Sequence, residues 1–173
     1  IVNAADSVKN VTATNLRLQA GGSIGTSGRH LTTNVDTLSA LASGGDLYLT
    51  EDNAVTVTNV SVSVTDFNSD ATTTAVTDND QSDIVSGADG NIVLVATLGD
   101  ITLNDGSDID GESVNANGSG SILIDALAGS VIANADILSG TGHITLKAGT
   151  NIALAAGVDV TTASTGTVSI DAE

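Results

Sequence analysis

The sequence predicts an all-β chain that folds as a right-handed parallel β-helix, a solenoid of about seven to eight coils with uncapped ends. The first observation is a repeated phrase: glycine, a small or polar residue, then two aliphatic residues separated by one position. Its clearest copies occupy residues 90–94, 120–124, 142–146 and 166–170, and their glycines lie 30, 22 and 24 residues apart. Fixed periods of this size are typical of solenoids.

The second observation is a composition that suits stacked coils. Val, Ile, Leu and Ala supply nearly all of the 40% hydrophobic residues; Tyr48 and Phe67 are the only aromatic residues, and Trp, Met, Cys and Pro are absent. Globular cores normally use aromatic residues and Met to fill irregular gaps. The 19 glycines are expected at tight corners with positive φ. Without Pro, every strand can donate its N–H groups to a neighbouring coil.

The first part of the chain carries the phrases in weaker form. Residues 15–20, 22–24 and 31–40 continue the alternation, and residues 45–49 repeat the glycine phrase. Residues 55–57 and 60–64 alternate with a period of two, which indicates strands with one buried face.

The pattern thins between residues 65 and 89, where aspartates accumulate. This segment is predicted to be either an irregular coil, with Ala75–Val76 and Ile84–Val85 as its strands, or an acidic loop that protrudes from the stack. The whole of 1–173 is otherwise predicted to be a single β-helix segment of a longer or tandemly repeated chain.

From residue 90 onward each repeat has three strand signals. The glycine phrase is followed by a second phrase at 99–103, 129–133 and 150–154, and by a third at 107–109, 135–137 and 158–160. The extra residues between Gly90 and Gly120 are assigned to a longer corner, because Asp105–Gly106 and Asp110–Gly111 are turn dipeptides. The predicted inward positions are Ile92, Leu94, Ile101, Leu103, Ile122, Ile124, Ile144, Leu146, Ile152, Leu154, Val168 and Ile170.

The two ends of the sequence read as halves of one repeat. Residues 168–173 followed by 1–6 resemble residues 122–126 followed by 131–136. Uncapped end coils also expose unpaired strand edges. The predicted partners are therefore adjacent copies of the same module, joined in tandem or docked head to tail into a filament.

The charge balance argues against two classes of partner. Four Lys and Arg residues against 21 Asp and Glu give a net charge of −17, which repels nucleic acid and anionic membranes. No apolar run approaches 18 residues, so membrane insertion is not expected. The absence of Cys excludes disulfides and thiolate zinc sites.

Residues 20–27, 31–40 and 44–49 resemble repeats of filamentous-haemagglutinin-like, adhesin-type β-helix chains, which belong to giant bacterial surface and secreted proteins. The resemblance covers most of the sequence except residues 65–89. It is a style of repeat without a catalytic motif, so it assigns no site residue to this chain. It implies an extracellular or cell-surface setting within a very long polypeptide.

Aspartates are the best candidates for a site. Asp6, Asp108, Asp136 and Asp159 hold the same place in the third phrase, and Asp83 precedes an equivalent Ile84. Stacked repeats would place these carboxylates about 4.8 Å apart, where a cation, calcium by preference, would relieve their repulsion. Alternatively, each makes a local turn hydrogen bond. Asp78 and Asp80, together with Asp83, also have the density of a calcium loop, although the segment suits a solvated acidic loop better.

Catalysis is not predicted. His30 and His143 lie far apart in the sequence, no nucleophile motif accompanies them, and two aromatic residues cannot line a carbohydrate cleft. The predicted function is a structural, non-catalytic segment of a bacterial extracellular fibre or adhesin that requires no cofactor. The alternatives are a carbohydrate-active β-helix enzyme, a lyase or glycosidase, since 21 acidic residues allow many carboxylate pairs, and a calcium-dependent binding module.

Overall fold

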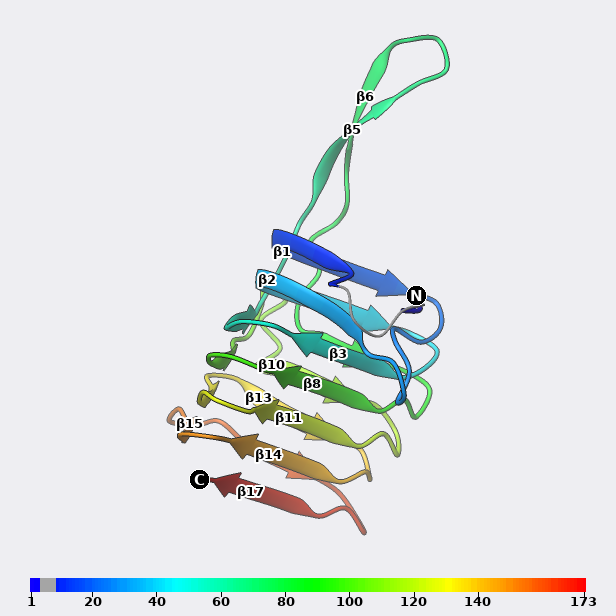
Figure 1. Ribbon diagram of the computed structural model, residues 1–173. Coiled ribbons are helices and arrows are strands. Elements are labelled where there is room, and N and C mark those ends of the chain that lie inside the picture. Colours follow the sequence, from blue (N-terminus) through cyan, green and yellow to red (C-terminus); the bar gives the residue numbers. More distant parts are fainter. Residues whose placement is uncertain (4–8) are drawn as a thin grey trace.

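The computed structural model describes residues 1–3 and 9–173, and these residues form strands with no helix among them (Figure 1). All strands except one hairpin and two isolated bridges pair in parallel, and they belong to one large, nearly closed sheet. This arrangement is consistent with a parallel β-helix, and it confirms the all-β, mostly parallel architecture that the sequence predicts.

Three ladders of parallel strands build the sheet. The first contains β3 (Leu47–Glu51), β8 (Ile92–Ala96), β11 (Ile122–Ala126), β14 (Ile144–Ala148) and β17 (Val168–Ala172). The second contains β4 (Val55–Val57), β9 (Ile101–Leu103), β12 (Val131–Ala133) and β15 (Ile152–Leu154). The third contains β7 (Ile84–Ser86), β10 (Glu112–Ala116), β13 (Asp136–Ser139) and β16 (Val160–Thr162).

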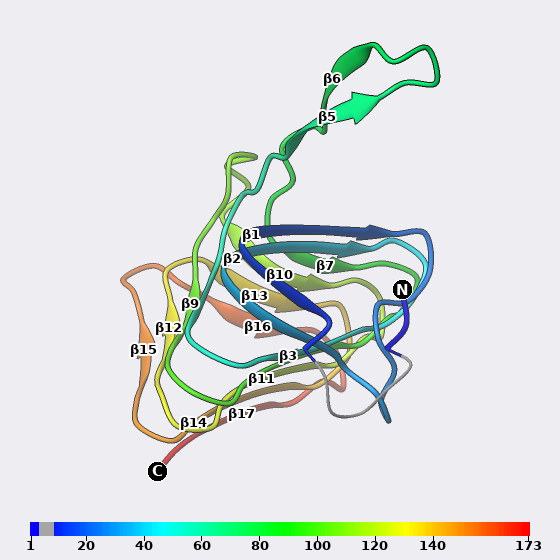
Figure 2. The same cartoon turned by 45° about the horizontal axis from the view of Figure 1, so that its top comes forward.

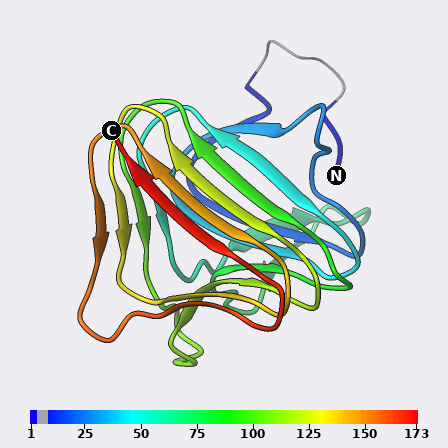
Figure 3. The same cartoon turned by 90° about the horizontal axis from the view of Figure 1, so that it is seen from below.

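The chain visits the three ladders in turn. β8, β9 and β10 are followed by β11, β12 and β13, and then by β14, β15 and β16. Seen from below, these circuits lie over one another around a common interior (Figure 3). At the other end, the long strand β2 (Leu31–Ala42) pairs with β3, β4 and β7 in succession, and β1 (Val11–Ala20) runs along β2.

The interior consists of aliphatic side chains from alternate strand positions. The eight predicted core residues from Ile92 to Leu146 are at most 2% exposed. Leu154, Val168 and Ile170 lie in register with buried residues of β12 and β14, yet they are 42–49% exposed. The predicted phase of these strands is therefore right, and the exposure arises because no described strand covers the last circuit.

The glycines of the repeated phrase are needed for space. Gly90, Gly120 and Gly142 do not have positive φ, so that part of the prediction is wrong for them. A Cβ atom on each would collide with the carbonyl oxygen of the phrase glycine in the preceding circuit, far inside the 3.0 Å that real Cβ atoms respect. The chain corners stack backbone against backbone here, and only glycine permits that approach.

A hairpin of β5 (Ser63–Phe67) and β6 (Thr73–Thr77) projects from the ladders beyond β1 (Figures 1 and 2). Its residues are exposed, including Phe67 at 77%. Ala75 and Val76 belong to this hairpin, whereas Ile84 and Val85 lie in β7 of the third ladder. The acidic segment thus contains both an excursion from the stack and one strand of it.

The carboxylate of Glu51 is buried inside the stack. Glu51, at the end of β3, is in register with Ala96 and fully buried. Its oxygens accept hydrogen bonds from the Thr33 hydroxyl at 2.6 Å, the Val35 N–H at 3.1 Å and the Asp52 N–H at 2.9 Å. These donors satisfy the charge, as burial of a carboxylate requires.

Among the described residues there is no helix long and apolar enough to cross a membrane.

Candidate functional site

The predicted column of aspartates is interrupted. The residues that precede the inward aliphatic position of the third ladder are, in successive circuits, Asp83, Ser113, Asp136 and Asp159. Asp136 and Asp159 are neighbours, and the Asp159 N–H donates to Oδ1 of Asp136 at 2.8 Å. Ser113 separates them from Asp83, so a continuous column is not formed, and the bond to Asp136 joins two successive circuits and is not a local turn hydrogen bond.

Asp108 does not lie on the third strand of its circuit, contrary to the prediction. Residues 107–109 do not form the third strand of their circuit, because β10 begins at Glu112 and contains a bulge between Glu112 and Val114. Ile109, the last residue of that phrase, is 84% exposed with a φ of 59°. Residues 104–111 form a loop instead, and Asp108 lies on it. Asp6, the first member of the predicted column, lies outside the described residues.

Asp78 and Asp80 lie between the hairpin and β7 and are engaged with other groups. Asp78 lies 3.9 Å from the Arg17 guanidinium. Asp80 accepts hydrogen bonds from the Asn59 amide at 3.0 Å and from the Ser107 hydroxyl at 2.5 Å. Neither belongs to the carboxylate cluster that contains Asp83, so the predicted calcium loop over 78–83 is not formed as a unit.

The structure instead gathers Asp83, Asp108 and Asp110. One carboxylate oxygen of each lies within 4.8 Å of those of the other two. Asp83 directly precedes β7, while Asp108 and Asp110 belong to loop 104–111 of the next circuit. This loop lies at the base of the hairpin (Figure 2). Sequence reasoning included Asp83 and Asp108 but missed Asp110, whose only signal was the turn dipeptide Asp110–Gly111.

Asp83 is the unusual member of this cluster. It is 2% exposed, its φ is 64°, and its Oδ1 has no hydrogen-bond partner. Burial, followed by the negative charges of Asp108, Asp110, Asp105 and Glu112, raises the pKa of Asp83 to about 8. Each of these effects disfavours the carboxylate form, so the environment favours either a proton or a cation at this oxygen.

Each of the two histidines contacts a residue of the neighbouring circuit. The His30 Nδ1 lies 2.9 Å from the Thr50 hydroxyl, and its ring lies 5.6 Å from that of Tyr48. The His143 Nδ1 lies 2.8 Å from the Thr167 hydroxyl of the neighbouring strand segment. Both contacts join successive circuits. Burial lowers the pKa of His30, against an opposing hydrogen bond with the Leu49 backbone.

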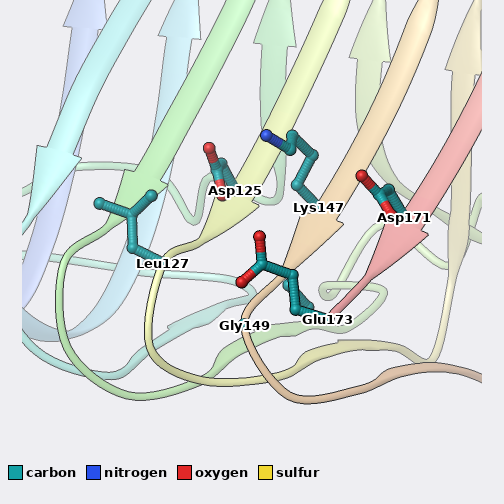
Figure 4. Close-up of a pocket in the computed structure, with 7 residues that line it drawn as sticks. Asp125, Leu127, Lys147, Gly149, Asp171 and Glu173 are labelled. Atoms are coloured by element: carbon teal, nitrogen blue, oxygen red, sulfur yellow. The ribbon is translucent and has the colours of Figure 1, made fainter.

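A small depression lies on the outer surface of the first ladder. Asp125 of β11, Lys147 of β14 and Asp171 of β17 are in register, and Figure 4 shows Lys147 between the two aspartates. Its volume is about 70 Å³, room for about two water molecules. Burial raises the pKa of Asp125, while Lys147 opposes the shift. Alternating charges on adjacent strands stabilise the ladder modestly.

The last circuit leaves a strand edge on every ladder. β15, β16 and β17 each pair on one side only in the described residues. At the opposite end, the Ile1 amino group donates to the Ser23 carbonyl, and the Gly25 N–H donates to the Ile1 carbonyl, each at 2.9 Å. These bonds place Ile1 beside Ile24 in the first ladder, whereas the sequence comparison had aligned residue 1 with Val131 of the second. Residues 4–6 of that alignment lie outside the described residues.

Comparisons with protein-family models, with curated proteins and with solved structures gave no match.

Proposed function

We propose that this chain is a structural, non-catalytic segment of a bacterial extracellular fibre or adhesin, and that it stacks end to end with neighbouring copies. In this proposal the ladders form a right-handed parallel β-helix of about seven to eight coils, since connections between parallel strands of one sheet are right-handed in nearly all proteins. The repeat style resembling haemagglutinin-like adhesins supports the extracellular setting. The net charge of −17 would keep a long rod soluble.

The open edge at β15–β17 is the observation that carries this proposal. Leu154, Val168 and Ile170 continue buried columns of the core but remain partly exposed. Their backbone also offers unpaired groups to a further strand. A further coil from an adjoining copy, stacked on this end, would cover the apolar side chains and extend all three ladders at once.

The opposite end offers a matching surface. Ile1 occupies the first ladder, and β1 presents its outer edge along the course of β2. A copy stacked by this end on β17 would place Ile1 next in the column of Val168, because Ile24, Leu47, Ile92, Ile122 and Ile144 already occupy that column. Such head-to-tail contact does not close on itself, and it therefore builds a filament.

Sedimentation velocity over a range of concentrations tests the proposal. The unaltered chain should self-associate, and Ile170→Asp should abolish association by placing a charge on the end face. Ser169→Asp, the neighbouring outward position, is the matched control and should leave association intact. A chain that stays monomeric at all concentrations, with amide exchange in β17 as slow as in β11, would refute end-to-end stacking.

A further inference from the structure

Two segments from successive circuits meet at the entrance to the third ladder. Asp83 lies just before β7, and loop 104–111 leads into β10, which pairs directly with β7. The loop is held against the earlier circuit by the Ser107 N–H, which donates to the Ser82 hydroxyl at 3.0 Å. The Ser107 hydroxyl also donates to Asp80. These hydrogen bonds fix the position of the loop, which places the carboxylates of Asp108 and Asp110 beside that of Asp83.

The carboxylate of Asp83 is aimed into this cluster without a partner. Asp83 is 2% exposed, and its Oδ1 is buried and makes no hydrogen bond. A buried carboxylate oxygen normally accepts hydrogen bonds or contacts a cation, as Glu51 of the same chain illustrates with its N–H and hydroxyl donors. Oδ1 of Asp105, in loop 104–111, is likewise a buried carboxylate oxygen with no hydrogen-bond partner.

We propose that Asp83, Asp108 and Asp110 bind one calcium ion, which fastens loop 104–111 to the preceding circuit. Their ligand oxygens lie within 4.8 Å of one another. Oxygens that share one calcium ion at about 2.3–2.6 Å lie at most about 5 Å apart, so the cluster already has the dimensions of a calcium site. Two of the chain's four basic residues are engaged elsewhere, as Lys9 pairs with Asp52 and Arg17 with Asp78.

The donor set selects calcium over other metals. Three carboxylates are hard oxygen ligands, which disfavours copper(I) and other metals that prefer soft ligands. Magnesium requires oxygens at about 2.0–2.1 Å in near-ideal octahedral geometry, a contraction that a strand entry and a loop anchored at Ser107 would resist. The remaining calcium ligands would come from Asp105, backbone carbonyls and water, as the ion's six to eight positions require.

The proposal does not depend on end-to-end stacking, because the cluster is complete within one chain. Bound calcium would join two successive circuits at a point where the loop interrupts the regular ladder. It would therefore stabilise the fold locally and order loop 104–111 most.

Calorimetric titration of calcium chloride into the full chain, first freed of metal with EDTA, tests the site. One ion per chain should bind, and thermal melting should occur at a higher temperature in calcium than in EDTA. Magnesium should bind at least tenfold more weakly. Asp83→Asn keeps the shape without the charge; it should melt no lower than the unaltered chain in EDTA, yet lose at least tenfold in calcium affinity.

Two further variants sharpen the test. Asp108→Asn changes an exposed residue and should weaken calcium binding even if Asp83→Asn fails to fold. Asp136→Asn is the matched control, because it holds the equivalent ladder position outside the cluster and should leave the titration unchanged. Identical melting in EDTA and in millimolar calcium would overturn the proposal. So would several weakly bound ions whose affinity is the same in Asp83→Asn and Asp108→Asn, since these would reflect surface charge alone.

Discussion

Replacement of Gly120 by Ala tests whether backbone stacking at the chain corners holds the circuits together. A Cβ atom at Gly120 would overlap the Gly90 carbonyl oxygen, lie 2.9 Å from the Gly90 carbonyl carbon and 3.2 Å from the Ala116 Cβ. Gly90 is backbone in the preceding circuit and cannot rotate away. The two circuits must therefore move apart at this corner by about 1 Å to restore ordinary contact distances.

The cost follows from the bonds beside this corner. Ser121, the next residue, accepts a hydrogen bond from the Ile92 N–H at 2.8 Å and donates to the Asn91 side chain at 2.9 Å. Overpacking costs about 1–3 kcal/mol, and each lost hydrogen bond about 0.5–1.5 kcal/mol. We therefore expect Gly120→Ala to lower the free energy of unfolding by about 4 kcal/mol, which corresponds to roughly 10 °C in Tm for a chain of this size.

Gly21→Ala is the matched control. Gly21 has no positive φ, and a Cβ atom added there would have nothing within 4 Å. Replacing Gly21 by Ala restricts the unfolded chain to the same extent as replacing Gly120 by Ala. Its free energy of unfolding should stay within about 0.5 kcal/mol of the original value. Urea denaturation followed by circular dichroism measures both variants. Equal stability of Gly120→Ala and Gly21→Ala would show that the circuits do not approach as closely as described.

Two further predictions concern the core and the ladders. Ile144→Asp places an unpaired charge at a fully buried position and should cost at least about 4 kcal/mol, whereas Thr145→Asp on the outward side of the same strand should be nearly neutral by the same denaturation assay. Because burial lowers the pKa of His30, the unfolded chain binds this proton more readily, so the contribution of His30 to stability should fall as pH drops below about 6.5. Asp83, whose pKa is raised to about 8, acts in the opposite direction, so the test is the difference between two melting curves. Between pH 7.5 and about 5.5, the Tm of His30→Gln should rise relative to that of the unaltered chain as pH falls, whereas the exposed His143→Gln should follow the unaltered chain; a constant difference for His30→Gln would contradict this assignment.

Much of the fold is contained in the local pattern of the sequence. A period-two alternation fixes which side chains can face the interior, and it placed the predicted core positions from Ile92 to Leu146 correctly. The repeated glycine marked every corner of the first ladder from Gly90 onward, although the reason is the adjoining backbone and not positive φ. These features repeat with the coil, so a single sequence displays them several times.

The candidate site depended on choices that the local pattern leaves open. Residues 107–109 and residues 112–114 each contain an acidic or polar residue followed by an aliphatic one, so either segment could form the third strand. Only the hydrogen bonding to β7 and β13 places strand β10 at the second of these segments. That choice moves Asp108 onto a loop, removes it from the column of Asp136, and brings it with Asp110 to Asp83. The sequence alone determined the period, the inward face and the acidic surface. The register between circuits, which is a long-range property of backbone hydrogen bonding, decided which carboxylates meet.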